Sequence, residues 1–210
     1  MLSCAEREQV RLRTLQNLKR TDWKAKPHIE IDDTTFEQRQ ERQEHAALRL
    51  LREAVARESE FLLFLEDDLE LNRNLRHNLQ RWYPLMYAGR GDHFFGSIYN
   101  PGVAHEWRDD DRAFFVAQPE CVYGSQAFIL SLDTARYIVA HWFEVPGMQD
   151  FKMSRLAARV CSIYYHIPSL VQHVGLVSTW GGTYHKANDY DFDWKDGGAV
   201  HREEGVISGS

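Results

Sequence analysis

The sequence has few cysteines and no long hydrophobic segment. Cys4, Cys121 and Cys161 are odd in number and widely spaced, which favours neither a disulfide framework nor a zinc site built from cysteines. No apolar run approaches the roughly 20 residues that a membrane-spanning helix needs. Charged residues begin at Glu6, unlike the start of a secretory signal peptide. These absences predict a soluble protein of a reducing compartment, namely the cytoplasm.

Two common phosphate-binding motifs are absent as well. The chain contains neither GxGxxG nor GxxxxGK(S/T), which disfavours a Rossmann dinucleotide enzyme and a P-loop kinase. The net charge of −6 gives no overall basic field, so the composition does not indicate binding to nucleic acid or to an anionic membrane. Positive charge is concentrated locally, between Arg11 and Lys26.

Strand-like and helix-like segments alternate along the chain. The 210 residues, 43% of them hydrophobic, suffice for one well-buried domain but are few for two. The expected strands lie at 1–4, 28–32, 61–65, 93–100, 123–130 and 163–175, the expected helices at 6–19, 36–55, 72–87, 131–141 and 148–160, and a long loop or small hairpin at 100–120. This order predicts a single α/β domain over residues 1–200, with a mostly parallel central sheet flanked by helices. A flexible tail is expected at 201–210.

The segment FLLFLEDD, at residues 61–68, is the most informative stretch. Its five apolar residues run directly into Glu66, Asp67 and Asp68, which predicts a strand buried on both faces with the acids at its C-terminal end. Ligands of open α/β sheets bind at that end of the strands. The acids are therefore placed to hold a divalent cation and a phosphate ester. The alternative interpretation is a solvated acidic turn.

The ordered set of motifs resembles nucleotide-sugar glycosyltransferases of the GT-A fold. The motifs are SCAER with Arg7, the acids Asp32 and Asp33 after the second strand, the DxD-type triplet at 66–68, YGSQAFILS at 123–131, Asp150 at the start of a late helix, and PSLVQHVG with His173. The EDD and QHVG segments are similar to those of branching N-acetylglucosaminyltransferases and of bacterial surface-sugar transferases. The resemblance implies a single GT-A-like, Rossmann-like domain.

The resemblance also implies a binding site for a UDP-sugar donor and for Mn²⁺ or Mg²⁺. Asp68 and His173 would be the metal ligands, and mixed oxygen and imidazole ligation favours Mn²⁺ over Ca²⁺. The implied donor-binding residues are Arg7 for uracil or phosphate, Asp32 or Asp33 for the uridine, Glu66 and Asp67 for ribose, sugar or bound water, and Gly124, Ser125 and Gln126 for the sugar. For His173, the alternative is a hydrogen-bonded core histidine, and for Asp33 it is a helix cap.

Asp150 is the candidate general base of an inverting transfer. A carboxylate at a helix N-terminus is well held and would take the proton of the acceptor hydroxyl. An ordinary helix cap is an equally simple interpretation of the same residue. The aromatic and glycine-rich segment at 180–184 is expected to close over the donor, and Trp107 with residues 109–111 either shapes the acceptor side or is a solvated charge run.

These residues predict a metal-dependent hexosyl- or N-acetylhexosaminyltransferase. Four classes of acceptor stay open, namely a glycan, a lipid, a protein and a hydroxymethylated DNA base, and the last would bind through the basic stretch at 11–26. Two alternatives from other classes stay open: a metal-dependent phosphoester hydrolase, and a non-catalytic module that binds nucleotide sugars.

Overall fold

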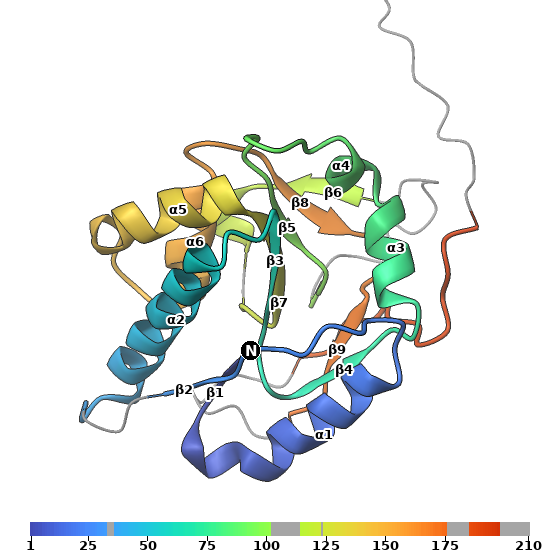
Figure 1. Ribbon diagram of the computed structural model, residues 1–210, viewed down its shortest axis with the longest axis horizontal. Helices are drawn as coiled ribbons and strands as arrows, with labels where there is room; N and C mark the ends of the chain where they lie inside the picture. The colour runs from blue at the N-terminus through green and yellow to red at the C-terminus, as the bar shows by residue number, and fades with distance from the viewer. Residues whose placement is uncertain (33–35, 102–113, 123, 176–184, 198–210) are drawn as a thin grey trace, which may run out of the picture.

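The computed structural model describes residues 1–32, 36–101, 114–122, 124–175 and 185–197 (Figure 1). Within them, five strands form a mixed central sheet in the order β3 (Phe61–Leu65), β7 (Ala127–Ser131), β5 (Phe95–Ser97), β8 (Ile163–His166) and β6 (Phe114–Ala117). Two smaller sheets are a parallel pair of β1 (Leu2–Ser3) with β2 (Glu30–Ile31) and an antiparallel pair of β4 (Leu69–Leu71) with β9 (Val171–His173). The chain is a mixed α/β protein, as predicted.

The central sheet is not mostly parallel, so this part of the prediction is wrong. Among the described residues, β3–β7, β5–β7 and β6–β8 are antiparallel pairs, and β5–β8 is the one parallel pair. β3, β5 and β8 do run in one direction, as expected for strands that helical crossovers connect. β7 enters between β3 and β5 in the opposite direction, and β6 lies in the segment expected to be a loop or hairpin. An apolar run indicates a strand but not the direction in which it joins the sheet.

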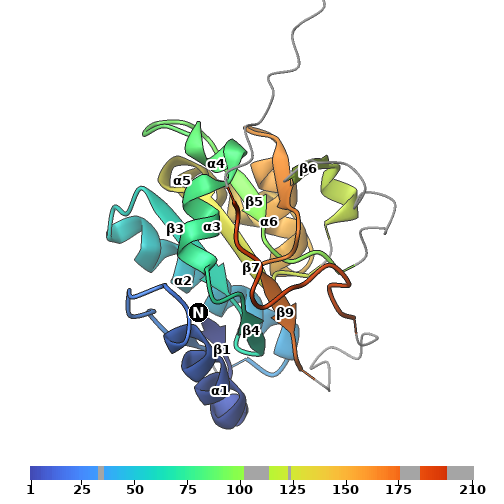
Figure 2. The same ribbon diagram turned by 90° about the vertical axis from the view of Figure 1, so that its right-hand side faces the viewer.

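Helices cover both faces of the central sheet (Figures 1 and 2). On one face lie α2 (Arg39–Ala56), α5 (Leu132–His141) and α6 (Gln149–Ala157), and on the other lie α3 (Leu75–Arg81) and α4 (Tyr83–Met86). The helix α1 (Glu8–Lys19) follows the 3-10 turn η1 (Ala5–Arg7) and packs against β4, and two more 3-10 turns are η3 (Pro119–Cys121) and η4 (Trp142–Glu144). The molecule is thus layered, with the sheet between two groups of helices.

β7 shows how the sheet separates two hydrophobic clusters. Phe128 and Leu130 belong to the cluster on the side of α2, α5 and α6, whereas Ala127 and Ile129 belong to the cluster on the side of α3. Successive side chains of a strand point to opposite faces, so β7 contributes to both clusters. A continuous apolar run is therefore required here, and the sequence AFIL provides it.

Ser131 is the N-cap residue of α5. Its side chain accepts a hydrogen bond from the backbone N–H of Thr134, which lacks a partner within the helix. The second helix was expected to start at residue 36, but α2 begins at Arg39. Its N-cap residue, Gln38, makes no capping hydrogen bond through its side chain.

The helix expected at 72–87 is two shorter helices. α3 ends at Arg81, Trp82 has an extended backbone conformation, and α4 follows with Pro84 in its first turn. Proline has no backbone N–H to continue the hydrogen-bond ladder of a preceding helix, and it suits the first turn of a new one. The break also directs Trp82 into the core, where it is 1% exposed.

Residues 185–197 form no helix or strand, but they pack along α3 (Figure 2). The side-chain amide of Asn72 donates to the backbone oxygens of Asp191 and Trp194, at 2.8 and 2.9 Å. Asn78 accepts a hydrogen bond from the backbone N–H of Asp196 at 2.9 Å. No strand or helix was expected in this segment, and its hydrogen bonds fix it to the second face of the sheet.

Several predicted features fall outside the described residues. They are Asp33, Trp107 with residues 109–111, the segment at 180–184 and the tail at 201–210. In the described part of the chain, no helix is long and apolar enough to cross a membrane. The three cysteines are free.

Candidate functional site

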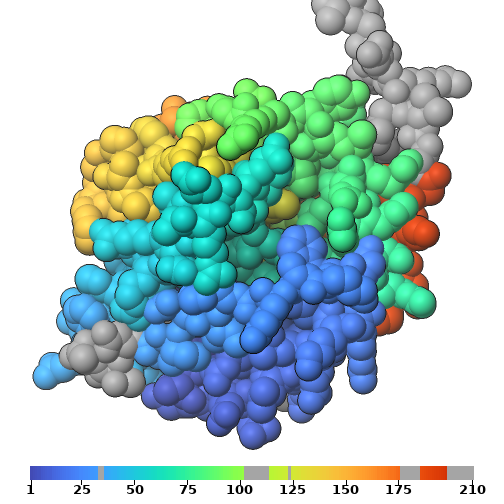
Figure 3. All heavy atoms as spheres, in the orientation of Figure 1, coloured from blue at the N-terminus to red at the C-terminus, as the bar shows by residue number. Residues whose placement is uncertain are grey.

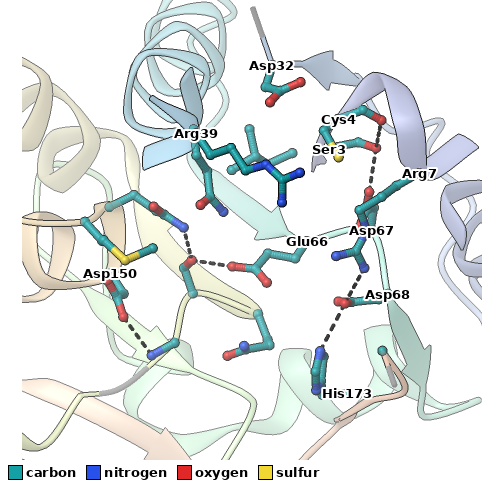
Figure 4. A pocket seen from close by; sticks show the side chains of 18 of the residues that line it. Ser3, Cys4, Arg7, Asp32, Arg39, Glu66, Asp67, Asp68, Asp150 and His173 are labelled. Atoms are coloured by element: carbon teal, nitrogen blue, oxygen red, sulfur yellow. Dashed lines mark hydrogen bonds and ion pairs between the residues drawn. The ribbon is translucent and has the colours of Figure 1, made fainter. Parts of the chain in front are cut away.

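One cavity of about 320 Å³ collects the residues predicted for the site (Figure 4). It lies where β1, β2 and β3 end and where β7 and α6 begin. Its lining includes all the residues predicted individually for metal binding, donor binding or catalysis in the described chain: Arg7, Asp32, Glu66, Asp67, Asp68, Gly124, Ser125, Asp150 and His173. The sequence thus predicted where these side chains converge, while their roles stay predictions.

The acidic triplet is a buried turn that the helix α1 holds in place. Asp67 and Asp68 are 4% and 3% exposed, so the alternative of a solvated acidic turn is wrong. The hydroxyl of Thr14 on α1 donates to the backbone oxygen of Asp67 at 2.6 Å and accepts from the N–H of Leu69 at 2.8 Å. The N–H of Glu66 donates to the oxygen of Gln126, which extends the pairing of β3 with β7. Both ends of the turn are therefore fixed.

Asp68 and His173 meet in this cavity although 105 residues separate them in the sequence. Nε2 of His173 lies 3.0 Å from Oδ2 of Asp68, as we expected of two ligands that approach a common point. The pairing of β4 with β9 brings them together, because it places His173 opposite Leu69 and binds the N–H of Val174 to the oxygen of Asp68. The prediction that the two side chains adjoin is confirmed.

The charges of this pair depend on each other. Burial opposes ionisation of Asp68, but its hydrogen bond with His173 and the guanidinium of Arg7 outweigh burial and lower the pKa of the carboxyl. Burial likewise opposes protonation of His173, but the contact with Asp68 prevails and raises the pKa of the imidazole. The carboxylate is thus ionised at neutral pH, as a metal ligand must be.

Arg7 is bound to the acidic triplet. Its Nε lies 3.0 Å from Oδ1 of Asp67, and its NH2 group contacts Oδ2 of Asp68. Ser3 donates a further hydrogen bond to Oδ2 of Asp67 at 2.6 Å. Arg7 thus offsets the charge of two buried carboxylates, a contact that the predicted role in uracil or phosphate binding did not include.

The residues around Asp68 and His173 fit a divalent cation. Oδ1 of Asp68 is buried and has no hydrogen-bond partner among the described residues, and an unpaired buried carboxylate oxygen is costly. The backbone of Gly175 passes so close that a Cβ there would lie 2.3 Å from Oδ2 of Asp68 and 2.9 Å from Nε2 of His173. Six acidic residues and three arginines line the cavity within the described chain. The donor set and this excess of negative charge suit Mn²⁺ or Mg²⁺.

Glu66 is held by a chain of hydrogen bonds from the opposite wall. The hydroxyl of Ser125 donates to Oε1 of Glu66, and the amide of Gln149 donates to the hydroxyl of Ser125 at 2.9 Å. Burial, and next the charge of Asp68, raise the pKa of Glu66 to about 7. Glu66 therefore changes its charge near neutral pH, unlike its neighbour Asp68.

Asp150 lies at the start of α6 with both carboxylate oxygens bound to backbone. Oδ2 accepts from the N–H of Gly124 at 2.9 Å, and Oδ1 accepts from the N–H of Phe151 at 2.9 Å. Gly124 has a φ of +80°, a conformation that favours glycine. The N-cap residue of α6 is Met148, which makes no capping hydrogen bond through its side chain. Asp150 is the second residue of the helix, and its two backbone contacts orient the carboxylate at the cavity wall. The base role of Asp150 stays a prediction.

No model of a protein family matches this chain, and no curated protein is significantly similar to it. Function is therefore inferred from the chemistry of the cavity together with the motifs of the sequence.

Sequence reasoning missed part of the lining. Arg39, Arg42 and Gln43 of α2 lie on the cavity, although none of them was predicted as a site residue. Their spacing of i, i+3 and i+4 places them on one helix face, a signal that was available. His185 also lines the cavity, and the hydroxyl of Tyr99 lies 2.8 Å from its Nδ1. No local pattern in the sequence indicates that contact.

Cys4, Glu6 and Asp32 form a second group of possible ligands at the cavity rim. Their ligand atoms lie within 4.8 Å of one another. Burial, and then nearby carboxylates, raise the pKa of the Cys4 thiol to about 11. A protonated thiol is a poor ligand, and hard cations prefer oxygen. This group therefore fits Mn²⁺ or Mg²⁺ less well than Asp68 and His173 do.

A second cavity of about 200 Å³ lies between α2, residues 23–28 and β3. Figure 3 views the molecule from this side, where α2 and the N-terminal residues border a recess. The lining is largely apolar and contains none of the predicted site residues. The cavity of the acidic triplet is therefore the candidate functional site.

Proposed function

We propose that this chain is a metal-dependent glycosyltransferase that moves a sugar from a UDP-sugar to an acceptor hydroxyl, on a GT-A-like fold. The observation that carries the proposal is the contact of Asp68 with His173, at 3.0 Å, inside the cavity that the other predicted residues line. Unrelated surface acids and a core histidine would have no reason to converge across 105 residues of sequence. The proposal joins this geometry to the resemblance of the motifs.

Asp68 and His173 would hold the cation, and the carboxylate of Asp68 has a buried oxygen available for it. When bound, the cation neutralises charge on the departing diphosphate. Arg7 holds Asp67 and Asp68 in position, and its charge favours the ionised form of each carboxyl. Glu66 and Ser125, which share a hydrogen bond, would orient hydroxyl groups of the donor.

Asp150 would act as the base of an inverting transfer. The acceptor oxygen forms a bond to the anomeric carbon while the bond between that carbon and the phosphate oxygen breaks. The electron pair of the broken bond stays on the diphosphate, and the proton of the acceptor hydroxyl goes to the carboxylate of Asp150. The backbone contacts with Gly124 and Phe151 would keep this carboxylate oriented during the transfer.

Thermal unfolding with a series of UDP-sugars, with and without Mn²⁺, tests the proposal. A ligand that binds only the native state raises the unfolding midpoint, so at least one UDP-sugar should stabilise the chain in the presence of the metal. No metal-dependent stabilisation by any UDP-sugar would exclude the proposed function. Phosphate release from simple phosphoesters without a sugar acceptor would instead favour a hydrolase, and donor binding without turnover a binding module.

Two variants separate metal binding from proton transfer. Asp68→Ala should abolish the metal-dependent stabilisation by UDP-sugar, because it removes a carboxylate ligand. Asp150→Asn keeps the size of the side chain and one of its two acceptor oxygens, so it should retain donor binding and lose about 100-fold or more of the transfer rate. Normal transfer by Asp150→Asn would show that Asp150 has only a structural role.

A further inference from the structure

We propose that Arg39 and Arg42 form a phosphoryl-binding subsite on the α2 side of the cavity. Both residues line the cavity, and among the described residues neither guanidinium makes a hydrogen bond or an ion pair. Nε of Arg42 is buried without a partner. This subsite would be part of the donor site of the proposed glycosyltransferase, and the assignment of a uridine nucleotide to it rests on that proposed function.

The position of the two arginines on α2 adds to their positive charge. Arg39 is the first residue of the helix, Arg42 follows one turn later on the same face, and the side chain of the N-cap residue Gln38 makes no capping hydrogen bond. Backbone N–H groups in a first turn carry partial positive charge and favour anions. Figure 4 shows the guanidinium of Arg39 extending from α2 into the cavity, above Glu66.

The remaining arginines near the cavity are engaged. Arg7 binds Asp67 and Asp68, and Arg11 donates to the hydroxyl of Ser3 at 2.9 Å and to the oxygen of Cys4 at 3.2 Å. Arg39 and Arg42 stand out because their positive charges face the cavity without such contacts. The charge of Arg42 acts through space on Glu6 and Asp32 and favours the ionised form of each carboxyl, but among the described residues Arg42 forms no ion pair.

A phosphoryl group matches this arrangement. The planar fork of a guanidinium presents several N–H donors that fit the oxygens of phosphate, and charge-assisted hydrogen bonds of this kind are strong. The phosphoryl group can come from the diphosphate of the nucleotide sugar or from a phosphate on the second substrate. Both molecules offer the same phosphate oxygens to Arg39 and Arg42. The subsite thus binds one kind of chemical group, which either molecule can carry.

Calorimetric titration of the whole chain with UDP, uridine and inorganic pyrophosphate, each with Mg²⁺, tests the subsite. In the double variant Arg39→Gln with Arg42→Gln, we expect UDP and pyrophosphate to bind at least tenfold more weakly. Uridine, which has no phosphate, should bind within twofold of its original affinity. Arg42→Lys keeps the positive charge but loses the forked guanidinium. Its affinity for UDP and pyrophosphate should lie between those of the unmodified chain and the double variant.

Arg52→Gln is the matched control, because Arg52 is exposed on the same helix and does not line the cavity. It should leave all three affinities unchanged. The unfolding midpoint of each variant establishes that it is folded. Should the double variant fail to fold, Arg42→Lys and the single Arg39→Gln carry the test.

The outcomes distinguish the subsite from the proposed function. Loss of both UDP and pyrophosphate affinity supports the subsite and assigns it to the nucleotide, whereas loss of pyrophosphate affinity alone assigns it to another phosphate. Unchanged affinities for both, or no binding of any probe by the unmodified chain, would overturn the subsite. Binding of pyrophosphate that requires the two arginines, in a chain that binds no UDP-sugar, would support the subsite and refute the proposed function.

Discussion

At the scale of single residues, the buried carboxylate of Asp68 depends on two partners. Asp68 is 3% exposed and contacts both Arg7 and His173. Removing one partner of a buried ion pair leaves the remaining charge uncompensated. The resulting loss in the free energy of unfolding is larger than the net contribution of the intact pair. The ionised state of Asp68 is thus a property of three side chains that come from η1, the turn after β3, and β9.

Gly175 should be sensitive to the smallest enlargement. Gly175→Ala would place a methyl group 2.3 Å from Oδ2 of Asp68 and 2.9 Å from Nε2 of His173. Arg7 and His173 hold the carboxylate, so it cannot move aside without losing their contacts. We expect Mn²⁺ affinity, measured by titration calorimetry, to fall at least tenfold.

Gly197→Ala is the control for this prediction, because no described atom lies within 4 Å of a Cβ built at Gly197. It should bind Mn²⁺ normally. If Gly175→Ala also binds Mn²⁺ normally, the cation is not held between Asp68 and His173.

Single residues of the site were predictable where a strong local pattern exposed them. Asp68 ends an apolar strand, and the resemblance of the motifs linked it to His173. Arg39 and Arg42 lie in a run of polar residues that resembles any solvated helix end. Their spacing places them on one face of α2, but the packing of α2 on the sheet decides that this face meets the cavity.

At the scale of elements, α1 serves as a support for the acidic turn. Thr14 is 1% exposed, and its hydroxyl satisfies the backbone oxygen of Asp67 and the N–H of Leu69. The turn between β3 and β4 cannot form these bonds within a sheet. One side chain of a neighbouring helix therefore replaces two ladder hydrogen bonds.

Thr14→Val should destabilise the protein by about 2–4 kcal/mol, because it leaves a buried N–H and a buried carbonyl without partners. Urea denaturation measures the change in the free energy of unfolding. Thr14→Ser keeps the hydroxyl, loses one methyl group, and should cost only about 1 kcal/mol. Equal losses in the two variants would mean that packing of the methyl group, and not the hydrogen bonds, matters here.

The existence of the elements was more predictable than their directions and limits. Apolar runs located β3, β5, β7 and β8, because a buried strand needs them. The antiparallel insertion of β7 depends on which strands it pairs with after the chain has turned. Those pairings are long-range tertiary contacts, which the local sequence does not specify. Pro84 in the sequence indicated that the helix expected at 72–87 is interrupted near Trp82.

At the scale of the whole molecule, the core on the α3 side contains a buried histidine that should make stability depend on pH. Nδ1 of His166 lies 2.7 Å from the oxygen of Pro168, and its ring packs against Trp82 and Trp194. Burial lowers the pKa of His166 from 6.5 to about 4. The unfolded chain therefore binds a proton between these pH values more readily than the native one does.

His166 should stabilise the fold fully above pH 6.5 and less as the pH falls from there toward 4. The expected loss between pH 7 and pH 5 is about 2 kcal/mol, measured by urea denaturation at both pH values. His166→Asn keeps a donor for the oxygen of Pro168 and cannot be protonated, so its stability should change less over this range. An identical pH dependence in the variant would assign the effect to other groups.

The two hydrophobic clusters on the faces of the sheet follow from the alternation of apolar strands and amphipathic helices. Composition and periodicity therefore predicted an α/β protein. They could not predict that residues 185–197 cover α3, because side-chain amides of Asn72 and Asn78 fix this segment and it has no periodic pattern of its own.

The place of β7 has a consequence for the order of assembly. Within the described residues, β3 pairs with β7 alone in the central sheet, and β7 follows it by more than sixty residues in the chain. On a ribosome, β3 and the acids at its end emerge first and must wait, without a strand partner, until residue 131 has been made. The acidic turn is thus made before β7 and β9, which complete its surroundings, and its charges oppose association of the unpaired apolar strand in the interval.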